Sequence, residues 1–170
     1  MKRIFTIAFI LMMAATAQLR AQGFKLGLGV EGALPLGDMS DLYKVGVGLT
    51  FRGAISLPAA GDVTLTSGAI AFLPKDLTYL GNDSKAQLNI PIKAGYRQMV
   101  QGPLYLMGEL GATIVRSYYG DANGDLQSVG ATRFTYAPSA GVILGSFDAS
   151  LRYEGYKGQS FVAVRLGFGF

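Results

Sequence analysis

The chain has 170 residues, of which 50% are hydrophobic and only 15% are charged, and its formal net charge is +4. Because about a quarter of the residues in an ordinary soluble domain are charged, this composition predicts that lipid solvates part of the surface. The sequence contains no cysteine and no histidine, which excludes disulfides, thiolate metal sites and catalysis by a histidine base. No linker-like stretch divides the chain, so one domain is expected.

The first residues have the pattern of a secretory signal peptide. Lys2 and Arg3 precede an apolar stretch, residues 4–13, which small residues follow up to Ala17. A membrane anchor is the alternative, but an apolar core of about ten residues is too short to span a bilayer as a helix. Without Lys2 and Arg3, 13 basic residues face 11 acidic ones, a balance that indicates no nucleic-acid partner. The predicted organisation is a cleaved signal peptide over residues 1–17, with 21–22 as the alternative end, and an outer-membrane barrel domain over residues 18–170.

The remaining sequence alternates with a period of two, as strands with two different faces do. In residues 43–57, Tyr43 and Val45 belong to an apolar face, whereas Lys44 and Arg52 belong to a polar face. An apolar face of this length can cross a bilayer, because about 9 to 11 tilted residues are sufficient. The same pattern predicts eight strands, over residues 24–34, 43–57, 62–73, 87–100, 103–116, 131–144, 146–155 and 160–170.

The third of these strands is irregular in sequence. Val63 and Leu65 alternate out of phase with Ile70 and Phe72, which predicts a bulge or a change of register at Ser67-Gly68.

The connections between the strands predict how the barrel lies in the membrane, because outer-membrane barrels have long outer loops and short periplasmic turns. Three of the four expected outer connections are longer than every inner one. This asymmetry predicts that both chain termini lie in the periplasm. The outer connections are residues 35–42, 74–86, 117–130 and 156–159, and the inner ones are residues 58–61, 101–102 and the region around Gly145.

The polar face of the strands combines a few charges with many glycines. A soluble barrel would crowd that face with lysine and glutamate, whereas small residues beside long ones fit a narrow lumen that has room only for side chains. Opposite charges shut inside a barrel should pair, because an isolated buried charge is costly. The charged residues predicted to face the lumen are Lys25, Glu31, Lys44, Arg52, Lys93, Arg97, Glu109, Arg133, Asp148, Arg152, Glu154 and Arg165.

This charge network has a structural and a functional interpretation. The structural one is an ionic plug that fills the lumen, and the functional one is a selectivity lining or a proton path. The excess of eight basic over four acidic residues keeps anion selectivity open. Aromatic residues near the predicted strand ends are expected to form interfacial girdles. They are Phe24, Tyr43, Tyr105, Tyr118, Tyr119, Phe134, Phe147 and Phe161.

The last eleven residues form a strand that ends on an aromatic residue. Its apolar face resembles the C-terminal strand of outer-membrane proteins, which the barrel-assembly machinery recognises. Together with the signal peptide and the strand count, the mature chain resembles small eight-stranded outer-membrane barrels of the OmpA-transmembrane-domain and OmpX type over nearly its whole length. The resemblance implies an all-β, antiparallel, up-and-down transmembrane barrel of a Gram-negative outer membrane. The predicted assembly signal consists of Val162, Val164, Leu166, Phe168 and Phe170.

The resemblance implies envelope integrity, adhesion or surface interaction, and no single shared activity. Barrel enzymes of this size rely on a histidine, which this chain lacks, so we predict that it is not an enzyme. Asp121, Asn123 and Asp125 resemble the beginning of a calcium loop, but Leu126 replaces the tight-turn glycine, so a polar loop is favoured and no metal or cofactor is predicted.

Two functions remain open. The first is a structural or surface-interaction protein embedded in outer-membrane lipids, with the loops 74–86 and 117–130 available to a surface partner. The alternative is a narrow transport or binding barrel for a small solute or an apolar ligand. A soluble periplasmic barrel is a third possibility.

Overall fold

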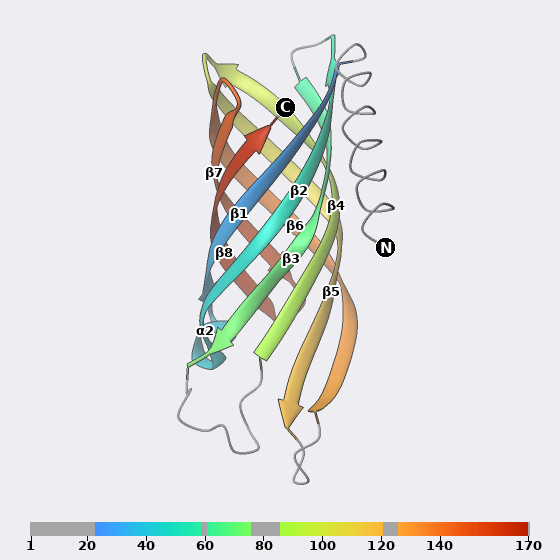
Figure 1. The fold of residues 1–170 in the computed structure, drawn as a ribbon, viewed down its shortest axis with the longest axis vertical. Helices are drawn as coiled ribbons and strands as arrows, with labels where there is room; N and C mark the ends of the chain where they lie inside the picture. The colour runs from blue at the N-terminus through green and yellow to red at the C-terminus, as the bar shows by residue number, and fades with distance from the viewer. Residues whose placement is uncertain (1–22, 59–60, 76–85, 121–125, 170) are drawn as a thin grey trace, which may run out of the picture.

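The computed structural model describes residues 23–58, 61–75, 86–120 and 126–169. These residues form eight antiparallel strands that close into a single barrel, in which successive strands pair and β1 pairs with β8 (Figure 1). The predicted all-β, up-and-down architecture is therefore confirmed. The strands are β1 (Phe24–Leu36), β2 (Tyr43–Leu57), β3 (Gly61–Pro74), β4 (Ala86–Gln101), β5 (Leu104–Gly120), β6 (Leu126–Leu144), β7 (Phe147–Tyr156) and β8 (Gln159–Gly169).

The barrel has two different ends (Figure 1). At one end, called the α2 end, the connection after β1 contains a short helix, α2 (Asp38–Leu42), where the sequence predicted only a loop. At the other end, called the hairpin end, β1 begins, β8 ends, and β4 and β6 turn tightly into the strands that follow them. Among the described residues, no helix has the length and apolar character needed to cross a membrane.

Glycine makes the tight turns possible. Gly102 and Gly145 have φ angles of +55° and +63°, which residues with a side chain adopt at a cost. The inner connections predicted at 101–102 and around Gly145 are confirmed at these positions. The predicted signal peptide and the sequence Asp121–Asp125 lie outside the described residues.

The predicted outer loop 117–130 is wrong for most of its length. Strand β5 continues to Gly120, and its pairing with β6 extends to Leu126. Because β6 pairs with β7 only from Thr135 onward, the end of this hairpin projects beyond the barrel at the α2 end (Figure 1).

Strand β3 has no irregularity at Ser67-Gly68, so that prediction was wrong. Its pairing with β2 runs in one register from Val45 and Leu73 to the hairpin end. Asp62 and Thr66 are buried on the same face as Ile70. The apparent change of phase arises because the interior itself changes along the barrel, from polar at the hairpin end to apolar at the α2 end.

The outward face of the barrel is apolar. Every strand exposes large aliphatic or aromatic side chains on this face, among them Val30, Leu49 and Leu110. A continuous apolar surface of this extent is unfavourable in water and matches the band that meets hydrocarbon in membrane barrels. The outward face therefore supplies the contact with lipid, and the interior contains the polar groups.

Candidate functional site

Charged side chains occupy the interior of the barrel. Nine of them are no more than 6% exposed, and the side chain of Asp148 is 13% exposed. Among the described residues this interior set has five basic and five acidic members, so its charges balance. The set consists of Arg52, Lys93, Arg97, Arg152 and Arg165, with Glu31, Asp62, Glu109, Asp148 and Glu154.

Five of these residues form the central cluster: Glu31, Lys93, Glu109, Arg152 and Glu154. The two Nη atoms of Arg152 donate to the two carboxylate oxygens of Glu31 at 2.7 Å each. Lys93 Nζ donates to Glu154 at 2.5 Å and lies 3.8 Å from Glu109. Two cations and three carboxylates leave the central cluster with one excess negative charge.

The central cluster is not fully satisfied. Among the described residues, neither carboxylate oxygen of Glu109 has a hydrogen-bond partner. Arg152 Nε lies 3.1 Å from Glu154 but makes no hydrogen bond, because the distance alone does not give the alignment that a hydrogen bond needs. Buried charges in this arrangement are paired electrostatically, which is the main condition for keeping them out of water.

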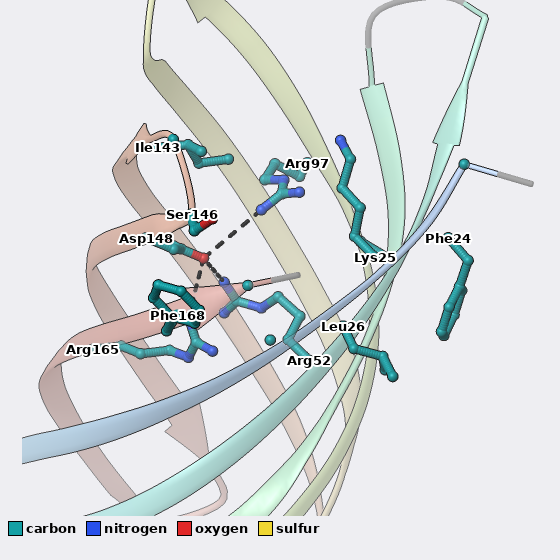
Figure 2. Close-up of a pocket in the computed structure, with 15 residues that line it drawn as sticks. Phe24, Lys25, Leu26, Arg52, Arg97, Ile143, Ser146, Asp148, Arg165 and Phe168 are labelled. Atoms are coloured by element: carbon teal, nitrogen blue, oxygen red, sulfur yellow. Dashed lines mark hydrogen bonds and ion pairs between the residues drawn. The ribbon is translucent and has the colours of Figure 1, made fainter. Parts of the chain in front are cut away.

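Nearer the hairpin end, a single carboxylate is shared by three arginines. Asp148 Oδ2 lies 3.0 Å from Arg52, 3.1 Å from Arg165 and 3.8 Å from Arg97 (Figure 2). Tyr105 donates its hydroxyl to the other oxygen of Asp148 at 2.7 Å, and Arg97 lies over the Tyr105 ring. We call these five residues the Asp148 cluster. Its basic residues outnumber its carboxylates by two.

Asp62 is a member of the interior set that the sequence interpretation missed. Arg97 donates to Asp62 Oδ2 from Nε at 2.9 Å and from Nη2 at 2.7 Å. Ser56 donates to Oδ1 at 2.7 Å, and Lys25 lies 3.7 Å away. The assumed register change in β3 hid this residue, because uninterrupted alternation from Thr64 places Asp62 on the polar face.

The structure brings together nine of the twelve charged residues predicted to face the lumen. Lys25 lies at the mouth, with a side chain 59% exposed. Lys44 is exposed because the pairing with β3 shifts between Tyr43 and Val45, which turns Tyr43 inward and Lys44 outward. Arg133 is exposed on the projecting hairpin. The predicted lumenal positions of Lys44 and Arg133 were therefore wrong, and the predicted basic excess of eight to four is replaced by a balance.

An apolar cluster occupies the α2 end of the interior. Met39 of α2 is 1% exposed and packs with Phe72 and Phe161, which are fully buried. Asn89 donates to the Tyr156 hydroxyl at 2.7 Å beside this cluster. Tyr43, Tyr105 and Phe161 are buried, so the prediction that they belong to interfacial girdles was wrong.

A cavity of about 420 Å³ lies at the hairpin end (Figure 2). Arg52, Arg97, Arg165 and Asp148 line its inner part. Phe24, Leu26 and Phe168 border the cavity, but their side chains lie on the outward face of the barrel, with Phe24 and Leu26 beside Gly53 and Phe168 49% exposed. The inner lining of the cavity is therefore mainly cationic.

The closing strand β8 has the two faces that the sequence predicted. Val164, Leu166 and Phe168 are exposed on the outward face, whereas Arg165 is buried on the inner face. Phe170 lies outside the described residues.

The fold matches solved bacterial barrels. Ail, the attachment invasion locus protein of Yersinia pestis, is 16% identical to this chain, and the two structures match with a TM-score of 0.64 over 86% of this chain and 97% of Ail. That structure of Ail was solved in complex with the heparin analogue sucrose octasulfate. The N-terminal β-barrel domain of Pseudomonas aeruginosa OprF is 14% identical, with a TM-score of 0.54 over 86% of this chain and 97% of that domain. The chain has the fold of the small outer-membrane barrels. Neisserial surface protein A also matches this outer-membrane barrel fold, with 11% identity and a TM-score of 0.52 over 86% of this chain and 94% of that protein.

The outer-membrane barrel fold confirms the architecture expected from the OmpA and OmpX resemblance. Protein-family models and curated proteins were also compared with the sequence, and none matches. Among the described residues, no group of acidic side chains is arranged so that it could hold a metal ion. The described interior contains ion pairs and a cationic cavity.

Proposed function

We propose that the protein is a non-enzymatic integral protein of the bacterial outer membrane, with a structural, envelope-integrity or surface-interaction role. The main supporting observation is the combination of an apolar outward face on every strand with an interior of paired charges. A soluble domain has its apolar side chains inside and its charges outside, so the opposite arrangement suits a barrel that is surrounded by lipid. Chemistry that uses histidine or cysteine is excluded, because the sequence contains neither residue.

The packed interior argues against the alternative of a transport barrel. A solute would have to pass the central cluster, in which Lys93 and Glu154 are fully buried and in contact, and then the apolar cluster around Met39. Both obstacles lie in series along one narrow lumen. An eight-stranded barrel is too narrow for an open channel beside its own side chains, so solute flux through the two clusters would require these side chains to leave their partners.

The projecting hairpin supports a surface role. Its β6 strand has no β7 partner before Thr135, and Val129 and Phe134 are 59% and 67% exposed. An unpaired strand edge with exposed apolar side chains can accept a partner strand. The connections 75–85 and 121–125 carry Asp76, Asp83, Asp121 and Asp125 against Lys75 and Lys85. The exposed residues at the α2 end add Asp38 and Asp41 to the acidic side chains and Lys44, Arg116 and Arg133 to the basic ones, so the charge is mixed and does not favour a polyanion such as the sucrose octasulfate found with Ail.

Export is part of the proposal. The signal peptide over residues 1–17 would direct the chain to the periplasm, and the face carrying Val162, Val164, Leu166, Phe168 and Phe170 would present it to the barrel-assembly machinery. The hairpin end would then lie in the periplasm and the α2 end outside the cell. Protease added to intact cells tests this orientation, because only the α2 end should be cut.

Cell fractionation tests the membrane location. The folded protein is expected in the outer-membrane fraction, with different gel mobility before and after boiling. Recovery in the aqueous periplasmic fraction would refute the proposal and favour a soluble barrel. Planar bilayer recordings test the closed interior, since a structural protein should be silent and regular conductance steps would favour transport.

A further inference from the structure

We propose that the cavity at the hairpin end binds a phosphate-bearing ligand, whose oxyanion is held by Arg52, Arg97 and Arg165. This binding function goes beyond the structural role proposed above. It rests on the charge of the cavity, on one arginine donor that has no partner there, and on the volume of the cavity.

The charge of this region is unbalanced. Lys25, Arg52, Arg97 and Arg165 face only two carboxylates, those of Asp62 and Asp148. The result is an excess of two positive charges, of which the neighbouring central cluster offsets one. The remaining positive charge is that of Lys25, whose side chain is 59% exposed at the mouth, and a cavity lined by charge of one sign attracts a ligand of the opposite sign.

Arg52 supplies a donor without a partner. Its Nε donates to Thr66 and its Nη1 to Asp148, but Nη2 has no hydrogen-bond partner among the described residues, although Arg52 is only 4% exposed. Asp148 cannot readily satisfy Nη2, since its oxygens already accept from Arg52, Arg165 and Tyr105. Arg52 lines the cavity, so an oxyanion bound there would offer Nη2 the acceptor that the described residues do not supply. A phosphate group offers more acceptor oxygens than a carboxylate and matches the planar fork of arginine.

The volume of the cavity indicates that the ligand is larger than a phosphate ion. The volume of about 420 Å³ exceeds what a lone phosphate fills and falls within the range of small-molecule sites. Leu26 and Phe168 border the cavity at the seam of β1 and β8, and their side chains lie on the outward face, where the acyl chains of a bound lipid would lie. At this seam Gly27 pairs with Gly169, so no side chain fills the space beside Arg165.

Two sources can supply such a phosphate. One is a phospholipid whose headgroup enters the cavity from the periplasmic leaflet, and the other is a soluble phosphate ester from the periplasm. Only the lipid source depends on the proposed membrane location. Binding of a soluble phosphate would therefore stand even if that location proved wrong.

The experiment uses the whole mature protein, folded in a maltoside detergent that contains no phosphate. Isothermal titration with glycerol 3-phosphate probes the soluble source, and native mass spectrometry with short-chain phosphatidylglycerol probes the lipid source. Arg52→Gln should weaken binding by about 10- to 100-fold, the range expected for loss of a charged hydrogen bond. Gly27→Leu should weaken binding similarly by filling the cavity without changing any charge. Arg133→Gln, which removes an exposed arginine at the other end, is the matched control.

Folding of each variant is checked by its heat-dependent gel mobility, and Gly27→Leu serves as the test if Arg52→Gln does not fold. Binding of either probe that is lost in the cavity variants and kept in Arg133→Gln supports the proposal and identifies the source. Two outcomes would overturn it: no saturable binding of either probe by the wild-type protein, or equal affinity in the cavity variants and the control.

Discussion

Replacing Arg152 by methionine should strongly destabilise the barrel. Arg152 makes two hydrogen bonds of 2.7 Å to Glu31, and both side chains are nearly fully buried. Hydrogen bonds to charged groups contribute about 1.5–3 kcal/mol each, and removing one partner of a buried pair costs about 3–5 kcal/mol. The substitution also changes the central cluster from one excess negative charge to two. We therefore expect the free energy of unfolding to fall by about 3–5 kcal/mol.

A second substitution tests whether the uncompensated charge is the cause. In Glu31→Gln/Arg152→Met the central cluster retains Lys93, Glu109 and Glu154, so its net charge returns to the wild-type value. The double variant should be more stable than Arg152→Met alone, although an extra interaction has been removed. We expect a coupling energy of about 2 kcal/mol or more, within the range seen for contacting residues.

Urea unfolding in phospholipid vesicles measures these energies, with the folded fraction read from gel mobility before boiling. Arg133→Gln is the control for loss of an arginine and should change the free energy of unfolding by less than about 0.5 kcal/mol. Additive losses in the double variant, or a loss below about 1 kcal/mol in Arg152→Met, would show that the Glu31 contact does not carry the stability assigned to it.

Three further substitutions test other parts of the structure in the same assay. Leu49→Arg places a charge on the lipid-facing surface and should cost about 2–4 kcal/mol in vesicles, whereas a barrel surrounded by water would tolerate it. In Gly29→Ala the new Cβ would lie 2.7 Å from the Arg165 guanidinium, so this substitution should lower the free energy of unfolding by about 1–3 kcal/mol. Gly32→Ala is its control and should have little effect, because a Cβ at Gly32 meets nothing within 4 Å. Phe72→Ala empties part of the apolar cluster and should cost about 3–5 kcal/mol, and a smaller loss would mean that the cluster is loosely packed.

The alternation of the sequence was sufficient to predict the strands, because lipid and lumen select opposite side chains at every second residue. The alternation predicted the wrong side-chain orientation at positions where lipid and lumen no longer select the side chains. Lys44 lies at a shift in pairing, and Arg133 lies on a hairpin that has left the barrel, so neither position is determined by the alternation. The loop predicted between β5 and β6 was mostly strand for the same reason, since the end of this hairpin lies outside the closed barrel, where lipid and lumen no longer select alternate side chains.

The sequence alone could not predict which interior charges pair with one another. Alternation placed Glu31 and Arg152 on the polar face, but their contact joins residues 121 positions apart across the lumen. Such a contact depends on the tilt and stagger of all the strands. The cavity was unpredictable for a related reason, because it depends on where β8 ends relative to β1.

Strand β7 shows what the interior charges contribute besides stability. Its backbone pairs only with β6 and β8, yet Asp148, Arg152 and Glu154 reach across the lumen to basic or acidic partners on β1, β2 and β4. A slip of one residue would turn all three side chains toward hydrocarbon, where an arginine costs up to about 2–4 kcal/mol and a carboxylate costs less. Apolar residues in place of these three charged ones could preserve the stability of the barrel, but a slipped register would then carry no cost of placing charges in hydrocarbon. We therefore expect the buried ion pairs to fix the register in which the barrel closes.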